Sequence, residues 1–465
     1  MIARISRSGW LAASAAAVFV LFSTHRASAA GCVRPTDPGG IDNYDYGTST
    51  VKSFGNASVL VWYATDGEHA VNTASTRSDG VPDDVANVAQ VTSDALASYA
   101  SMGFLPPISD SLNPSCGSNG GDARLDVYLV HMVGADGLTD TEAGRCTTAG
   151  AAVKCASFLF AQSNYAGFYP TADIGVHTVL PHETFHAVQN AYDSKIDRFW
   201  AEGTAQWAAK TLDPSLTDLE RFLPAFFMQL SRSLDAPSNG VTSDFLYGSA
   251  IWPVFLTQRH GNGIVKSILE QEGKAGGAAL DATDVVLQSE QSSLATEYAT
   301  FAAWNAATGS RSGAGGYPDA AKYPEATLTE LAVNTTADGS TSGLASYYYH
   351  VKTDSAVTVG VGGDDDTRTA ATVVPYQNGV PNLDMLQTAP ASLNGEGILV
   401  VSGITTSKVD APYGTYFDDG SSASSGSSGG CAITSARSNF EPRDLVMLPF
   451  LGFLAVIRRR KSRAS

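Results

Sequence analysis

Two histidines four residues apart, with a glutamate directly after the first, constrain the local structure of this chain more than any other feature. They are His182 and His186, in the segment LPHETFHAVQNAYDSKIDRFWAEGTAQW that spans residues 180–207. On a helix, residues four apart share a face, so both imidazoles can reach a single ion. We expect Pro181 in the first turn of this helix, where its missing N–H has no helical partner to lose. The spacing predicts a metal site on a helix.

A second glutamate, Glu202, is the expected third ligand. Catalytic zinc takes three protein ligands and keeps a fourth position for water, whereas magnesium and calcium prefer oxygen ligands. Glu202 follows His186 by sixteen residues. This distance lets the first helix end near Tyr192 and Asp193 and lets a second helix begin at Phe199. We therefore expect Zn²⁺ as the cofactor.

Glu183 has a different expected role from that of the ligands. Because it is adjacent to His182, it points beside the ion, where it can take a proton from zinc-bound water and later pass it to a leaving amine. The alternative is an ordinary amphipathic helix with His and Glu at its surface. Apolar neighbours favour the buried metal site: Val179, Leu180, Phe185 and Val188.

The pattern HETFHAVQ…FWAEGTAQW resembles the gluzincin metallopeptidases, in which H-E-x-x-H on one helix precedes a glutamate ligand on the next. It is most similar to secreted metalloproteases of myxobacteria, and the likeness spans residues 50–310. VWYATDG and LDVYLV upstream and YGSAIWPVFLTQRHG downstream are part of it. The resemblance implies that His182, His186 and Glu202 bind zinc and that Glu183 is the general base.

Two features depart from that family pattern. The gap to the third ligand is shorter than in thermolysin-like members, and Gln206 stands where those members have an aspartate that orients a ligand histidine. A glutamine can accept the same hydrogen bond but raises the basicity of the ligand less. The family also uses a donor for the oxyanion of the tetrahedral intermediate. Tyr247 is the expected donor, with a packed tyrosine as the alternative reading, and His260 is a weaker candidate.

The rest of the chain predicts an α+β fold with two folded parts. Residues 58–64, 124–132 and 156–161 read as strands, and apolar residues recur at helical spacing within 77–104. A helix-rich stretch follows the metal motif to about residue 310. From 318, short alternating runs with Gly and Asp turns predict a small all-β sandwich. We therefore assign a gluzincin-like peptidase domain to 31–317 and a β-sandwich-like domain to 318–417.

Three acidic residues near the start of the expected helix in 77–104 allow two interpretations. Asp79, Asp83 and Asp84 could hold calcium, or they could favour the helix start through its dipole. Helix capping is the commoner role for such residues. The sequence does not decide between the two.

The N-terminal 30 residues read as a secretory signal peptide. Arg4 and Arg7 precede an apolar core, and Ala27–Ala29 forms an A-x-A cleavage site. Lipid attachment at Cys32 is an open alternative, although the leucine usual before such a cysteine is missing. We expect an exported chain.

The C-terminal end reads as a sorting signal. A Ser/Gly-rich linker, 418–431, ends at Cys431, and residues 432–465 form a tail with an apolar run, 445–457, and a basic cluster. This order resembles the MYXO-CTERM tails of myxobacterial surface proteins, which implies a sorting protease as a partner and a tail that is only transiently inserted in the membrane. The alternative is a weak membrane anchor.

Charge and cysteine content fit an extracellular protein. The chain has a net charge of −17. Loss of the signal peptide and of the segment after Cys431 leaves 19 basic and 44 acidic residues, which argues against nucleic acid as a partner. Cys146 and Cys155 flank a short loop and are the expected disulfide pair. Cys32 then pairs with Cys116 by elimination.

These features predict an exported, monomeric zinc-dependent endopeptidase that acts on protein or peptide substrates. The alternative is a surface adhesion protein that keeps a degenerate peptidase domain as a non-enzymatic scaffold. An intact H-E-x-x-H motif with its distant glutamate favours the enzyme, because loss of activity would free Glu183 to change.

Overall fold

The computed structural model describes residues 32–419, except 38, 42–43, 114–115, 237–243 and 364–366. All of these belong to one compact unit that ends at Ser421. The expected signal peptide, Cys431 and the sorting tail lie outside the described residues, so the expectations about them stay predictions.

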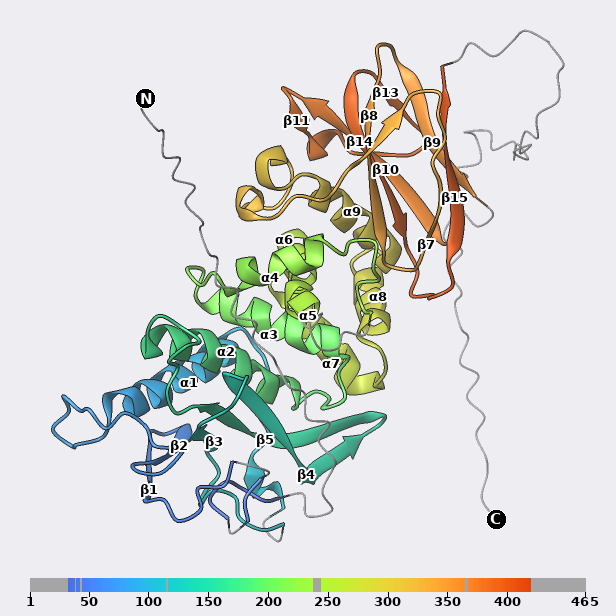
Figure 1. The fold of residues 1–465 in the computed structure, drawn as a ribbon. Coiled ribbons are helices and arrows are strands. Elements are labelled where there is room, and N and C mark those ends of the chain that lie inside the picture. Colours follow the sequence, from blue (N-terminus) through green and yellow to red (C-terminus); the bar gives the residue numbers. More distant parts are fainter. Residues whose placement is uncertain are drawn as a thin grey trace, which may run out of the picture. The chain divides into compact units, whose positions relative to one another are not determined.

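The described chain is a mixed α+β structure (Figure 1). Its first part runs β1 (Val51–Gly55), β2 (Val59–Ala64), α1 (Asp83–Ser101), η1 (Asp110–Leu112), β3 (Leu125–Val130), β4 (Gly137–Ala149), β5 (Ala152–Gln162). Helices follow: α2 (Ala172–Gln189), α3 (Arg198–Leu212), α4 (Asp218–Phe227), α5 (Asp244–Gly248), α6 (Ile251–His260), α7 (Gly263–Ala275), α8 (Ala279–Ser289), α9 (Leu294–Ala306), η3 (Gly309–Arg311), η4 (Ala320–Lys322). The last part is β6 (Thr329–Ala332), β7 (Asp338–Thr341), β8 (Ser346–Lys352), β9 (Val357–Gly363), β10 (Thr369–Gln377), β11 (Val380–Pro381), η5 (Leu383–Met385), β12 (Gln387–Thr388), β13 (Ala391–Leu393), β14 (Glu396–Gly403), β15 (Ala411–Asp418).

A five-stranded sheet in the order β1-β2-β3-β5-β4 forms the first layer. Strands β2, β3 and β5 run parallel, and β1 and β4 pair antiparallel at the two edges. The central strands are apolar without a break because both faces are covered. On β3, Val127 and Leu129 face the core under α1 and α2, while Tyr128 and Val130 face a second cluster. The three predicted strands are confirmed, and the edge strands β1 and β4 were not predicted.

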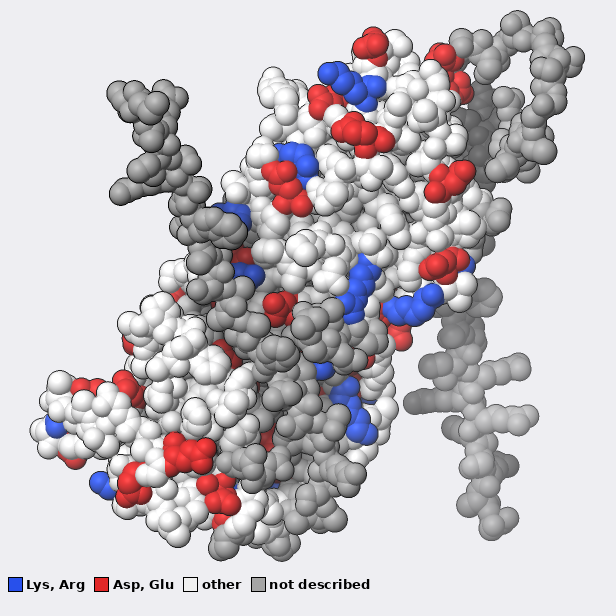
Figure 2. All heavy atoms as spheres, in the orientation of Figure 1, with Lys and Arg blue, Asp and Glu red and all other residues white. Residues whose placement is uncertain are grey.

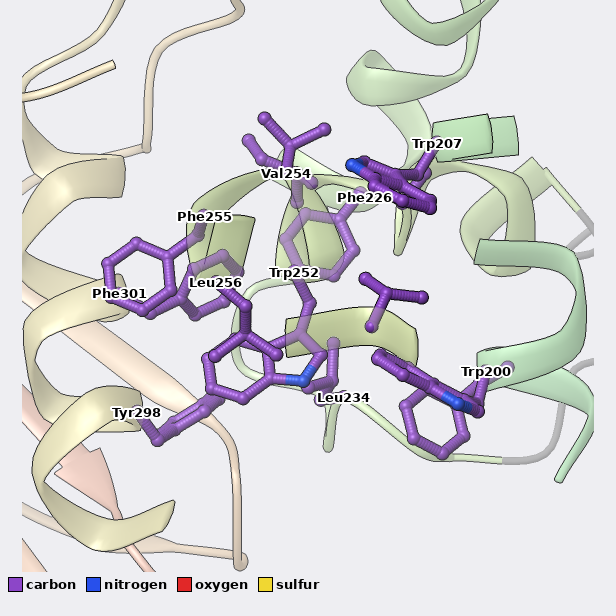
Figure 3. Close-up of a cluster of buried hydrophobic side chains, with 14 of the residues drawn as sticks. Trp200, Trp207, Phe226, Leu234, Trp252, Val254, Phe255, Leu256, Tyr298 and Phe301 are labelled. Carbon is purple, nitrogen blue, oxygen red and sulfur yellow. The ribbon is translucent and has the colours of Figure 1, made fainter. Parts of the chain in front are cut away.

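The middle of the chain is a group of helices around one large aromatic core (Figure 3). Trp252 of α6 has no exposed surface and stacks on Phe255, with ring centroids 5.6 Å apart. Phe301 of α9 meets the same indole edge-on at 5.1 Å. Offset and edge-on contacts of this kind add to the free energy gained by burying aromatic rings. The Trp252–Phe301 contact joins α6 to α9.

Two antiparallel-rich sheets make up the last part of the chain. One sheet runs β11-β10-β14-β8-β6 with β12 beside β10, and the other runs β13-β9-β15-β7. Inward-facing residues of both sheets, such as Val351, Val359 and Val401, are buried in a common cluster between the sheets. The opposite side of the six-stranded sheet joins the helical core through Tyr348, Ile398 and others. The short strands predicted from the sequence for this region correspond to the strands of these two sheets. The helices and the six-stranded sheet share one core.

Both predicted disulfides, Cys32–Cys116 and Cys146–Cys155, are confirmed. Two disulfides fit an extracellular or otherwise oxidising environment. Within the described residues, no helix is long and apolar enough to cross a membrane. On the face drawn in Figure 2, acidic and basic side chains of the described residues are interspersed, with no continuous basic patch.

A buried charge network is centred on Arg34, which follows Cys32 by two residues. Arg34 has no exposed surface and pairs with Asp110 at 2.9 Å, Asp126 at 2.8 Å and Glu142 at 2.9 Å. Arg145, also fully buried, pairs with the same Glu142. These five side chains tie the N-terminal segment to η1, β3 and β4.

Candidate metal centre

Helix α2 carries both histidines on one face. The helix starts at Ala172, where the Thr171 side chain accepts a hydrogen bond from the Ile174 N–H. Pro181 is therefore inside the helix, and the prediction that it lies in the first turn is wrong. A proline there removes the hydrogen bond to the His177 carbonyl. The helix is buried along most of its length from Gly175 to Gln189.

Helix α3 brings Glu202 to the two histidines. It begins at Arg198, one residue before the predicted start, and α2 ends at Gln189, a few residues before the predicted end. The Gln189 side-chain amide N–H donates to the Ala201 carbonyl at 2.8 Å and to the Thr204 hydroxyl at 2.7 Å. This amide fixes the end of α2 against the first turns of α3, so the position of Glu202 relative to His186 depends on packing between the two helices.

The three side chains form a compact set of donor atoms. His182 Nε2 lies 3.3 Å from Glu202 Oε2 and 3.0 Å from His186 Nε2, and His186 Nε2 lies 3.5 Å from Glu202 Oε2. Ligands at zinc distances of about 2.0–2.1 Å in a tetrahedron are about 3.3 Å apart, which these distances match. The side chains are 10%, 16% and 15% exposed, so solvent reaches the centre. Among the described residues, this is the one group of three His, Cys, Asp or Glu that is close enough to share an ion.

The charges around the donors favour a cation between them. Burial raises the pKa of Glu202, but hydrogen bonds and charge from His182 and His186 outweigh burial and lower it well below its ordinary value. Burial likewise opposes protonation of His186, yet Glu202 and Glu183 raise the pKa of this imidazole to about 9. Two negative carboxyl groups beside two imidazoles thus stabilise positive charge at this point.

Glu183 is held by the edge strand β4. The Thr139 hydroxyl lies 2.8 Å from both the Glu183 carbonyl and its Oε2. Burial raises the pKa of Glu183, and the neighbouring imidazoles partly offset this effect. A carboxyl group with a raised pKa next to a reaction centre is suited to exchange protons near neutral pH. Thr139 belongs to β4, a strand that was not predicted from the sequence.

Gln189 fixes the orientation and tautomer of His186. Its amide N–H groups face the Ala201 carbonyl, which can only accept, so its Oε1 faces His186 Nδ1 at 2.7 Å. The oxygen requires a proton on Nδ1, and this leaves the Nε2 lone pair free for a metal. The expected orienting residue, Gln206, instead donates to Asp218 Oδ2 at 3.1 Å. Its expected hydrogen bond to a ligand histidine is therefore absent among the described contacts.

Two cavities are lined in part by Glu183. One, of about 340 Å³, is lined by Glu183, His186 and Glu202 together with β4 residues. The other, of about 120 Å³, is lined by His182 and Glu183. Tyr247 of α5 lines both.

Tyr247 and His260 have different positions relative to this centre. The Tyr247 ring stacks on Phe222 at 4.8 Å and lies 5.9 Å from the His182 ring. His260 ends α6 and pairs with Glu290 at 2.6 Å and Glu297 at 3.4 Å, so its ring nitrogens face other partners. Of the two candidates for oxyanion donor, the structure brings only Tyr247 to the cavities.

The acidic residues before α1 have partners within the protein. Asp79 pairs with Arg77 and accepts from the Val81 N–H, and Asp83 accepts from the Thr76 N–H. Asp83 and Asp84 occupy the first turn of α1, where the helix dipole favours them. The three do not form a group close enough to share an ion; the helix dipole accounts for Asp83 and Asp84, and the pair with Arg77 accounts for Asp79.

Comparison with known proteins does not define a family for this chain. No family model matches it, and no curated protein matches it. It is similar to the pre-peptidase C-terminal domain of collagenase from Bacillus anthracis, at 14% identity and a TM-score of 0.15, over 20% of this chain and 95% of that one. It is similar to the same degree to Aeromonas hydrophila PliG, a periplasmic inhibitor of g-type lysozyme, over 20% of this chain and 96% of that one. Similarities this weak bear on neither the site nor the function.

Proposed function

We propose that this protein is an exported zinc-dependent endopeptidase of the gluzincin type, with a β-sandwich-like region after the peptidase part. The observation that carries the proposal is the triangle of His182, His186 and Glu202 donor atoms, at 3.0, 3.3 and 3.5 Å, with Glu183 beside it. Two imidazoles and one carboxylate with an open side form the ligand set of catalytic zinc in peptidases.

The three donor side chains would hold the zinc ion. When bound there, zinc supplies a Lewis acid that polarises the substrate carbonyl and lowers the pKa of water toward about 7. Gln189 supports this binding because it holds the Nδ1 proton of His186 and so directs Nε2 toward the other two donor atoms.

Glu183 performs the proton transfers in this proposal. It accepts a proton from the attacking water and delivers it to the amine that leaves when the peptide bond breaks. Thr139 restrains the carboxyl group with a hydrogen bond of 2.8 Å, which limits its rotation between the two transfers. The Tyr247 hydroxyl donates a hydrogen bond to the oxygen on which negative charge develops.

Strand β4 offers a place for the peptide backbone. It is the last strand of its sheet among the described residues, so one of its edges has no strand partner. Gly137, Leu138 and Thr139 of this strand line the larger cavity beside Glu183. An extended peptide that pairs with this edge lies across the metal centre, with its amide groups hydrogen-bonded to the strand.

Hydrolysis of casein and of unstructured peptides by the purified mature chain tests the proposal. We expect activity that a chelator abolishes and zinc restores. The Glu183→Gln variant should lose activity and keep the metal, while the exposed Glu290→Gln variant should behave as the wild type. Retention of near-wild-type turnover by Glu183→Gln would contradict the proposed mechanism.

A further inference from the structure

The smaller cavity borders His182 and Glu183 of the proposed reaction centre. It has a volume of about 120 Å³ and reaches His182 and Glu183. It shares Gly137, Glu183 and Tyr247 with the larger cavity. A residue bound here is therefore adjacent to the proposed reaction centre.

Aromatic rings form much of the wall of this cavity. Phe168, Tyr169, Phe222 and Tyr247 line it, and the Phe222 and Tyr247 rings stack at 4.8 Å. Val179 of α2 adds an apolar surface. Such walls suit a long aliphatic stem, and their ring faces attract a cation at its end.

Two carboxylates, Asp136 and Asp218, line the same cavity as these rings. The Tyr169 hydroxyl donates to Asp136 Oδ2 at 2.7 Å, and the Gln206 amide donates to Asp218 Oδ2 at 3.1 Å. The Asp218 side chain is only 14% exposed. In each carboxylate, one oxygen is held and oriented by a neighbouring side chain.

The positive charge in the lining does not balance these carboxylates. Arg221 is the one cation that lines the cavity among the described residues, and its Nη1 lies 3.5 Å from Asp218 Oδ1. It is 46% exposed, so solvent weakens this pair. Asp136, Asp218 and Asp244 line the same space. The cavity is therefore negative, with an apolar wall.

We infer that this cavity selects a lysine or arginine side chain next to the scissile bond, with its stem against the aromatic rings and its charged end at Asp136 and Asp218. The inference rests on the proposed peptidase function and adds the substrate class. A free α-amino group has the same charge, so the test uses peptides blocked at both ends.

Cleavage of a blocked peptide mixture, analysed by mass spectrometry, first identifies the position that carries the preference. A matched pair of peptides then places lysine or norleucine at that position. We expect kcat/KM to favour lysine by at least about tenfold, the effect of one charge-assisted hydrogen bond. The Asp136→Asn/Asp218→Asn double variant should reduce this ratio to below about threefold. Asp281→Asn, which removes one exposed carboxylate on α8, should leave the ratio unchanged.

The ratio separates specificity from a general defect, because damage to the metal centre slows both peptides equally. A wild-type ratio below threefold, or a ratio that survives the double variant, would overturn the inference. Binding of the same two peptides to Glu183→Gln protein, measured by fluorescence anisotropy, gives an independent reading. If wild-type protein cleaves neither peptide, the proposed function fails. Tighter binding of the lysine peptide would still support the assignment of the cavity. Equal binding of the two peptides would refute that assignment.

Discussion

Replacing Glu272 with glutamine should make the protein more resistant to alkaline pH. Glu272 lies on α7, is 1% exposed, and neither carboxylate oxygen has a hydrogen-bond partner within the described structure. The Trp200 indole is near but not in hydrogen-bonding geometry. Burial, with added repulsion from Asp197 and Asp193, raises the pKa of Glu272 from 4.5 to about 8. The folded protein therefore binds this proton more tightly than the unfolded chain does.

The sign and size of the effect follow from proton linkage. The stability that protonated Glu272 confers is fully present below pH 4.5 and is lost as pH rises to about 8. For this pKa difference, the free energy of unfolding falls by about 3 kcal/mol between pH 5 and pH 8 through this group alone. Glutamine does not titrate, so the variant should lack this part of the decline.

Denaturant unfolding at pH 5, 6, 7 and 8, with the disulfides intact, measures the difference. The midpoint for Glu272→Gln should rise relative to wild type as pH increases. Glu270→Gln is the matched control, because Glu270 lies on the same helix, is 39% exposed and pairs with Lys266. Parallel pH profiles for wild type and Glu272→Gln would refute the reasoning.

Three further substitutions test other parts of the structure. Arg34→Met should lower the free energy of unfolding by about 3–5 kcal/mol because it leaves buried carboxylates unpaired. The control Arg77→Met, at an exposed pair, should change this free energy by less than about 1 kcal/mol. Denaturant midpoints compare the two variants, and equal shifts would contradict the account. Gln189→Leu should weaken zinc binding by about 10- to 100-fold through loss of the hydrogen bond to His186, and an unchanged dissociation constant in a competition assay would reject this role. Tyr247→Phe should lower kcat by about 10²–10³ with little change in KM, and a change below about threefold would leave this ring as packing alone.

The parts of the site that the sequence predicted depend on local spacing. His182 and His186 share a face because a helix repeats every 3.6 residues, whatever the rest of the chain does. Glu202 followed at a distance that one turn between two helices can span. The strands β2, β3 and β5 were predicted because their apolar runs are continuous, which results from burial on both faces of the sheet.

The parts that the sequence did not predict depend on packing at a distance. Strand β4, with the sequence GLTDTEAGRCTTA, lies at an edge and is mostly half-buried or exposed, so it has no apolar alternation to detect. Gln189 orients His186 only because α3 places the Ala201 carbonyl beside its amide. Pro181 was expected at a helix start because proline favours that position, whereas α2 begins nine residues earlier, at Ala172.

The metal content of the purified mature chain after zinc-replete expression tests the central claim most directly. We expect about one equivalent of zinc per chain in the wild type and in Glu183→Gln, and loss of the metal in His186→Ala and Glu202→Ala, because only the last two remove a ligand. Less than about half an equivalent in the wild type, or full retention of zinc in His186→Ala, would contradict the account.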